Sequence, residues 1–149
     1  MTPATSLWSR TGRAYAVAEG WIDKLQSVAA LAIRLYLARV FIASALTKLN
    51  DWSITVALFE NEYHVPILPP AMAAVLGTAA ELGLPLLLVA GLGTRAAALA
   101  LFAFNIVAVV SYPDLSDAGQ KDHILWGTLM LVLAVYGPGK LSVDRLLSR

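Results

Sequence analysis

The stretch that decides the fold is GTAAELGLPLLLVAG, residues 77–91, which is almost wholly apolar and yet carries a carboxylate at Glu81. A charge at the centre of a membrane helix costs about 3 kcal/mol on insertion scales, and each leucine returns about 0.5 kcal/mol. Glu81 must therefore be protonated, paired with a cation, or turned toward a wet cavity. Pro85 lacks an N–H, so it leaves the carbonyl of Glu81 without its helical donor. A structural ion pair and a proton or ligand site are both open interpretations.

The composition around this stretch is that of a membrane protein. The chain has 149 residues, of which 58% are hydrophobic and 14% charged, whereas a soluble domain has about 25% charged residues. Apolar segments at 29–49, 71–90, 96–110 and 123–136 predict an all-α bundle of four transmembrane helices. The net charge of +1 offers no argument for nucleic acid, so the expected partner is the lipid bilayer. Cysteine is absent, so any redox chemistry would need a bound cofactor or a partner protein.

Charge and periodicity predict how the chain meets the membrane. Helical spacing of Val17, Trp21, Leu25 and Val28 predicts a short amphipathic helix on the membrane surface. By the positive-inside rule both termini are cytoplasmic. We accordingly expect a cytoplasmic segment with this interfacial helix at 1–28, a membrane domain at 29–140 and a cytoplasmic tail at 141–149. The basic residues on the cytoplasmic side are Arg10, Arg13, Lys24, Arg95, Lys140, Arg145 and Arg149, against Lys48 and Lys121 on the other.

The first span holds three possible partners for Glu81. Arg39 lies near its middle, at a depth close to that of Glu81, and is too deep to reach the headgroups easily. Arg34 and Lys48 share one face within about 40°, and Arg39 points about 140° away from Arg34. Lipid anchoring, at the inner and outer headgroups respectively, is one interpretation of Arg34 and Lys48. Glu81 and Arg39 are therefore the candidate catalytic residues.

The outer side of the membrane gathers a second set of polar residues. His64 and His123 both fall there, on different loops, and their spacing does not predict a metal site. Asp122 is a candidate cap for the fourth span or a participant in chemistry. His123 is a candidate proton relay, although a solvated histidine explains it equally well. Trp126 fits an aromatic belt at the membrane interface.

Three segments resemble the DoxX family of small bacterial membrane proteins. They are RLYLARVFIASALTKL (34–49), AAELGLPLLLVAGLGTRAAAL (79–99) and KDHILWGTLMLVLAVYGPGKLSVDRLL (121–147). The resemblance covers roughly residues 30–147 and implies a four-helix membrane bundle in a multi-pass protein of the bacterial inner membrane. It also implies family residues at Arg34, Lys48, Glu81, Asp122 and His123. This chain departs from the family at Arg39, where members have an apolar or aromatic residue.

The resemblance also implies a function. A related group forms the membrane part of a thiosulfate:quinone oxidoreductase, and other members are associated with membrane oxidoreductase complexes in oxidative-stress defence. We therefore expect an accessory subunit of a quinone-linked or thiol/sulfur-linked redox system, with an oxidoreductase partner and with homo-oligomerisation left open. The branch with a YHVP loop resembles proteins encoded beside enzymes that modify copper-binding peptides, so a non-enzymatic role in copper stress, transport or scaffolding is the alternative. The candidate residues for binding a cofactor such as a quinone are Arg34, Lys48, Glu81, Asp122, His123 and Trp126.

Overall fold

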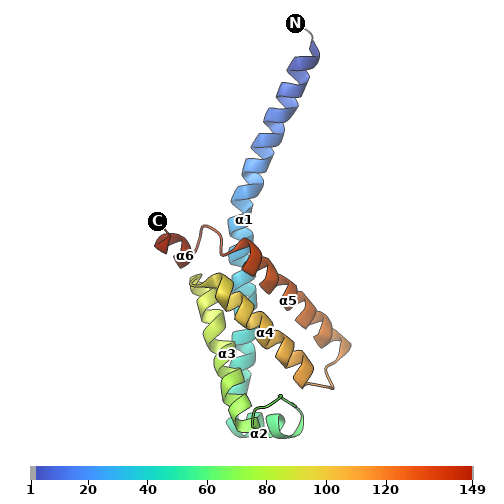
Figure 1. The fold of residues 1–149 in the computed structure, drawn as a ribbon, viewed down its shortest axis with the longest axis vertical. Coiled ribbons are helices and arrows are strands. Elements are labelled where there is room, and N and C mark those ends of the chain that lie inside the picture. The colour runs from blue at the N-terminus through green and yellow to red at the C-terminus, as the bar shows by residue number, and fades with distance from the viewer. Residues whose placement is uncertain (1–2, 149) are drawn as a thin grey trace.

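The structure is a computed structural model that describes residues 3–148, and within this range helices are the only regular secondary structure. The predicted all-α bundle is therefore confirmed. Figure 1 shows that α1 runs the length of the molecule and that α3, α4 and α5 pack beside its second half. The helices are α1 (Pro3–Asn50), α2 (Trp52–Asn61), α3 (Pro70–Ala90), α4 (Thr94–Ser111), α5 (Asp117–Tyr136) and α6 (Val143–Leu147).

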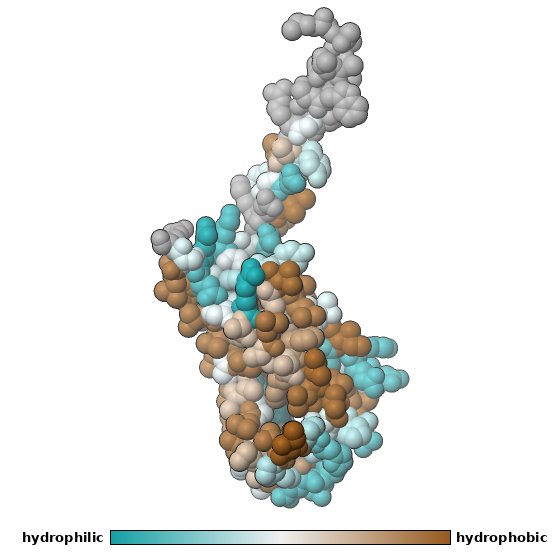
Figure 2. Space-filling model, in the orientation of Figure 1, coloured by the Kyte–Doolittle hydropathy of each residue, from teal (hydrophilic) through white to brown (hydrophobic). Residues whose placement is uncertain are grey.

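The helices carry the apolar surface that a bilayer requires. Three segments are long and apolar enough to cross a membrane, namely Tyr15–Asn50, Pro70–Ala90 and Thr94–Ser111. Helix α5 runs beside α4 but begins with a polar turn that includes Lys121 and Asp122, so its role as a fourth span stays a prediction. In Figure 2 hydrophobic side chains cover the middle of the bundle, and hydrophilic ones gather at its two ends. We name these the α2 end and the α6 end.

The N-terminal part of the chain differs from the expectation. The predicted interfacial helix is not a separate element, because α1 is continuous from Pro3 to Asn50 and projects well beyond the bundle (Figure 1). No proline follows Pro3 within this stretch, and Gly12 and Gly20 alone do not end a helix. At 1.5 Å per residue α1 is about 72 Å long, more than twice the thickness of a bilayer core. The first two residues of the predicted N-terminal segment lie outside the described range.

Local signals explain where the other helices begin and end. The predicted outer loop after α1 contains helix α2, because the Asp51 side chain caps it by accepting a hydrogen bond from the N–H of Ile54 (3.0 Å). Helix α3 begins at Pro70 and ends at Gly91, whose φ of 68° is left-handed. Helix α5 is capped by Ser116, so the predicted capping role of Asp122 is wrong.

The core of the bundle forms where α1 crosses the hairpin of α3 and α4 and the neighbouring α5. Its fully buried side chains interlock around α1 and leave the opposite face of that helix exposed. Helix α2 packs on the start of α3 through Phe59, against Ala73 and Ala74, and thereby closes the α2 end of the bundle. The main core residues are Leu37, Phe41, Leu88, Leu101, Met130 and Leu133.

Candidate functional site

Glu81 forms an ion pair with Lys48 inside the bundle. The Lys48 Nζ lies 2.7 Å from Oε2 and 2.9 Å from Oε1 of Glu81. Ser44 joins the pair, because its hydroxyl donates to Glu81 Oε1 (3.2 Å) and accepts from Lys48 Nζ (2.9 Å). The side chain of Glu81 is 8% exposed and that of Lys48 is 18% exposed. The carboxylate is thus sheltered and paired inside the apolar region, as the sequence required.

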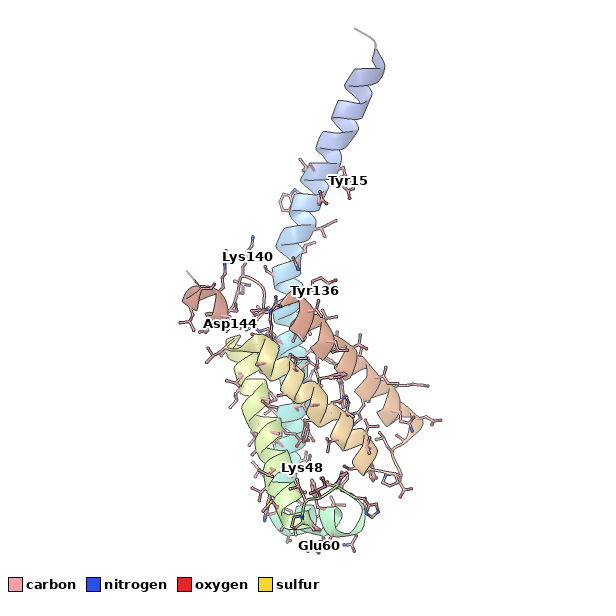
Figure 3. The ribbon with its side chains drawn as sticks, viewed as in Figure 1. Tyr15, Lys48, Glu60, Tyr136, Lys140 and Asp144 are labelled. Carbon is pink, nitrogen blue, oxygen red and sulfur yellow. The ribbon has the colours of Figure 1, made fainter. Side chains whose placement is uncertain are left out.

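The antiparallel packing of α1 and α3 brings these two residues together. Side chains on a helix tilt toward its N-terminus. Lys48, near the end of α1, therefore leans back toward the middle of the bundle, and Glu81, midway along α3, leans toward the α2 end. The long lysine stem spans the remaining separation through apolar surroundings. Figure 3 places Lys48 between the helices in the half of the bundle that lies toward α2.

Arg39 does not take part in this arrangement. Lys48 follows it by nine residues, which rotates the side chain by about 180° around α1. Arg39 is accordingly exposed on the face of α1 that points away from Glu81. The expected proximity of Arg39 to Glu81 is therefore wrong, and so is the interpretation of Lys48 as a lipid anchor. Equal depth along two helices does not bring side chains together when they point in opposite directions.

The ion pair forms part of the wall of a cavity of about 540 Å³ at the α2 end of the bundle. Of the residues predicted to bind a cofactor, Lys48, Glu81, His123 and Trp126 line this cavity, whereas Arg34 and the exposed Asp122 do not. Most of the remaining wall is aliphatic or aromatic. Its principal side chains are Val40, Phe41, Phe59, Tyr63, Val65, Leu76, Phe104, Val107, Ser111, Tyr112 and Leu115.

Asn105 holds His123 at the edge of this cavity. The Asn105 amide nitrogen donates to the backbone carbonyl of His123 (3.0 Å), and its amide oxygen lies 2.7 Å from Nδ1 of the imidazole. A carbonyl can only accept, so the amide oxygen must face the ring and Nδ1 must carry a proton. The neutral imidazole therefore keeps its lone pair on Nε2. Sequence reasoning missed Asn105, although a lone amide in an apolar helix was an available signal.

Aromatic rings form part of the cavity wall at the α2 end. The ring centroid of Tyr63 lies 4.8 Å from that of Phe59 and 5.0 Å from that of Tyr112. Burial raises the pKa of the Tyr63 hydroxyl, and nearby Tyr112 and Glu62 raise it further. Tyr63 therefore stays protonated at neutral pH and can donate a hydrogen bond. The N–H of His64 donates to the carbonyl of Ser111 (2.7 Å), which ties the 62–69 loop to the end of α4.

Arg34 has a structural role at the opposite end of the bundle. It is 1% exposed, and its guanidinium donates to the carbonyls of Leu88 (2.6 Å), Val89 (2.8 Å), Pro138 (3.1 Å) and Leu141 (2.7 Å). These contacts satisfy the C-terminus of α3 and hold the segment before α6 against it. The interpretation of Arg34 as an anchor to the inner headgroups is therefore wrong.

Asp144 completes the α6 end. Its carboxylate accepts hydrogen bonds from the N–H groups of Gly93 (2.7 Å) and Thr94 (2.9 Å) at the start of α4. Partial burial alone would raise the pKa of Asp144, but these backbone donors and the nearby Arg34 outweigh it and lower the pKa. Lys140 and Asp144 lie at this end in Figure 3, far along the bundle from Lys48. The tail thus docks on the turn between α3 and α4.

Comparisons with known proteins agree with this architecture. The model of the DoxX family matches residues 29–113. The chain is also 30% identical over 131 residues to a protein of Haemophilus influenzae, with 82% of this chain and 85% of that protein covered. That relative is described only as an uncharacterized protein. No solved structure matches the chain. Within the described residues, no group of three or more histidine, aspartate or glutamate side chains is arranged to hold a metal ion.

Proposed function

The chain belongs to the DoxX family, and from this premise we propose that it is an accessory subunit of a membrane redox system whose cavity binds a quinone. The chain itself is a membrane protein with an apolar helical bundle. In the proposed role the partner subunit supplies the electrons, since the chain has no cysteine. The bundle supplies a site within the bilayer where a lipid-soluble carrier is held.

The observation that carries the proposal is an ion pair set in the wall of an apolar cavity. Ligand sites for small molecules measure about 300–1,000 Å³ and combine an apolar lining with a few polar groups. The cavity, at about 540 Å³, falls within this range, and Lys48 and Glu81 are its charged wall residues. A purely structural pair would be better served by tight packing around it, because a neighbouring cavity forfeits packing contacts.

The polar groups in the wall fit a ligand with carbonyl oxygens. Ser111 is 2% exposed, lines the cavity, and its hydroxyl has no hydrogen-bond partner within the described part of the chain. A buried hydroxyl without a hydrogen-bond partner destabilises the protein, and a ligand with an acceptor atom in the cavity would remove this cost. Tyr63 lines the same space, and its hydroxyl stays protonated. The aromatic and aliphatic wall would accommodate the ring and the first part of an isoprenoid tail.

In the proposed role, the ion pair and the imidazole donate and accept the protons of the reaction. A bound quinone would supply two-electron, two-proton chemistry. The Lys48 ammonium holds a proton next to the cavity, the Glu81 carboxylate is positioned to receive one, and the two stabilise each other's charge at 2.7 Å. His123, which also lines the cavity, is held in one tautomer by Asn105, and in this proposal it passes protons toward the α2 end.

Binding of decylubiquinone to the purified protein in nanodiscs tests the proposal. We expect saturable binding, and we expect Glu81→Gln to weaken it about tenfold through loss of a charged hydrogen-bonding group. The matched control is Asp122→Asn, which makes the same chemical change at an exposed position outside the cavity. Equal weakening by both variants, or no saturable binding by the wild type, would overturn the quinone assignment.

The proposed location is the bacterial inner membrane, crossed by α1, α3, α4 and α5, with both termini in the cytoplasm. The excess of Lys and Arg at the α6 end, such as Lys140 and Arg145, over the α2 end supports this orientation. Alkaline phosphatase, which is active only outside the cytoplasm, should be active when fused after residue 116 and inactive when fused after residue 149. The opposite pattern would reverse the topology.

A further inference from the structure

Arg39 is a cation on the outer, apolar face of the bundle. It is exposed, and no hydrogen bond or ion pair within the described residues involves it. The face around it consists of Ala32, Leu35, Ala43 and Leu46, all of which are exposed. Leu35 is 47% exposed and Leu46 is 57% exposed. This face of α1 therefore combines apolar surface that suits lipid with a charge that does not.

The depth of Arg39 makes this placement costly. Arg34, five residues earlier, reaches carbonyls at the end of α3. The backbone of Arg39 therefore lies about 7.5 Å further along α1 than that of Arg34, deeper in the apolar region. Lys48, nine residues later, lies about 13.5 Å further along the helix. Arg39 is thus near the middle of the stretch that the bundle encloses. Ionisable residues at such depth normally face a protein partner or water.

A second copy of this chain does not provide that partner. A two-fold symmetric contact through this face would bring the two Arg39 side chains toward each other, and like charges repel. A contact with another face would need an exposed carboxylate at the same depth. Between residues 29 and 111 the carboxylates are Asp51, Glu60 and Glu62 at the α2 end and Glu81, which is buried against Lys48.

We propose that this face of α1 is the docking surface for a transmembrane helix of a different protein, and that a carboxylate on that helix pairs with Arg39. Charge complementarity identifies the chemistry of the partner. The short side chains of Ala32 and Ala43 on the same face let a second helix approach closely, as small residues do in membrane interfaces. Leu35 and Leu46 then pack on either side of the ion pair. This surface is separate from the cavity, so it does not depend on quinone binding.

The test is purification of the full-length protein from its own host membranes in a mild detergent, with quantitative identification of the membrane proteins that accompany it. We expect one of them to carry Asp or Glu within a transmembrane helix. Arg39→Met should lower its recovery by at least about tenfold, and Arg39→Lys should retain part of it. Lys121→Met is the matched control, because Lys121 is an exposed cation outside the apolar stretch, and it should leave recovery unchanged.

Two further results decide the proposal. Exchanging the charges, with Arg39→Glu in this chain and Lys in place of the partner's carboxylate, should restore recovery. The proposal is overturned if recovery of every membrane protein is independent of Arg39, as it would be were the guanidinium held by lipid phosphates. It is also overturned if Ala43→Cys, introduced into a chain that has no cysteine, forms a disulfide with a second copy in the membrane.

Discussion

Replacing Lys48 by Met would remove the cation from the buried pair while preserving much of the stem's volume. In the wild type the ammonium lies 2.7 Å from the Glu81 carboxylate, which is 8% exposed. Without Lys48, that carboxylate is left with a single hydrogen bond from Ser44 at 3.2 Å. It must then bind a proton or draw water into the cavity. Either response raises the free energy of the folded state but not that of the unfolded state, so the protein becomes less stable.

The expected magnitude follows from this burial. Removing one partner of a buried ion pair costs about 3–5 kcal/mol, and the 18% exposure of the Lys48 side chain favours the lower end. We therefore expect Lys48→Met to lower the free energy of unfolding by about 3 kcal/mol. For a chain of this size that corresponds to a melting temperature lower by roughly 6–12 °C. Adding Glu81→Leu removes the stranded carboxylate and should return most of the lost stability.

Thermal unfolding in detergent, followed by circular dichroism at 222 nm for the two single variants and the double variant, measures this coupling. Arg39→Met provides the matched control for the purified protein, since it removes a cation from the same helix without breaking a contact within this chain, and should change stability by less than about 0.5 kcal/mol. If the double variant were less stable than Lys48→Met alone, the two residues would not act as a pair and the reasoning would fail.

Three further predictions concern the ends of the molecule and the cavity edge. The folded-state pKa of Asp144 lies below its ordinary value of 3.8. The stabilisation by its carboxylate should therefore be complete above that pH and disappear as the pH falls through the lowered pKa. The melting temperature of Asp144→Asn should lack this pH-dependent decrease, and identical plots of melting temperature against pH for the two proteins would contradict the prediction. Arg34→Met should leave carbonyls at the α6 end without a hydrogen-bond donor and lower the free energy of unfolding by about 3 kcal/mol or more. Limited proteolysis of this variant should cut first between residues 137 and 148. Resistance to proteolysis equal to that of the wild type would refute the docking role of Arg34. Ile67 has a left-handed φ of 71° and is fully exposed, so Ile67→Gly should raise the free energy of unfolding by about 1 kcal/mol in chemical denaturation, and a loss of stability would show that its side chain has a contact role.

Much of the fold could be predicted because its determinants are local. The apolar segments of the sequence predicted α3 and α4. The ends of the helices follow from residues close in sequence, such as Pro70 at the start of α3 and Gly91 after its end. The continuation of α1 through residues 17–28 is also a local property, but the change from amphipathic to apolar spacing near residue 28 does not coincide with a break in the helix. Helix α2 lies between the predicted spans 29–49 and 71–90, and its N-terminal cap Asp51 is a local signal for it that the hydropathy pattern does not contain.

The candidate site was predictable in part. Glu81 was identified because a carboxylate in a leucine-rich segment needs a partner. Lys48 was one of its three possible partners, and His123 was among the candidate binding residues. The depth of Arg34, Arg39 and Lys48 along α1 does not show which of them pairs with Glu81. The answer depends on which face of α1 packs on α3. Arg34 binds carbonyls 54, 55, 104 and 107 residues away in sequence, and no local pattern reports such distant acceptors.

The amino-acid sequence by itself determined that this chain is a helical membrane protein with one carboxylate that its own bundle must shelter. Hydropathy adds up along consecutive residues, and a helix satisfies its backbone hydrogen bonds within itself, so both conclusions need only neighbouring residues. Tertiary structure alone decided that Lys48 shelters Glu81 beside a cavity, that Arg34 fastens the tail, and that Arg39 faces outward. The physical reason is rotation about the helix axis: about 100° per residue sets where side chains point relative to each other, but packing against α3 sets which of them points inward.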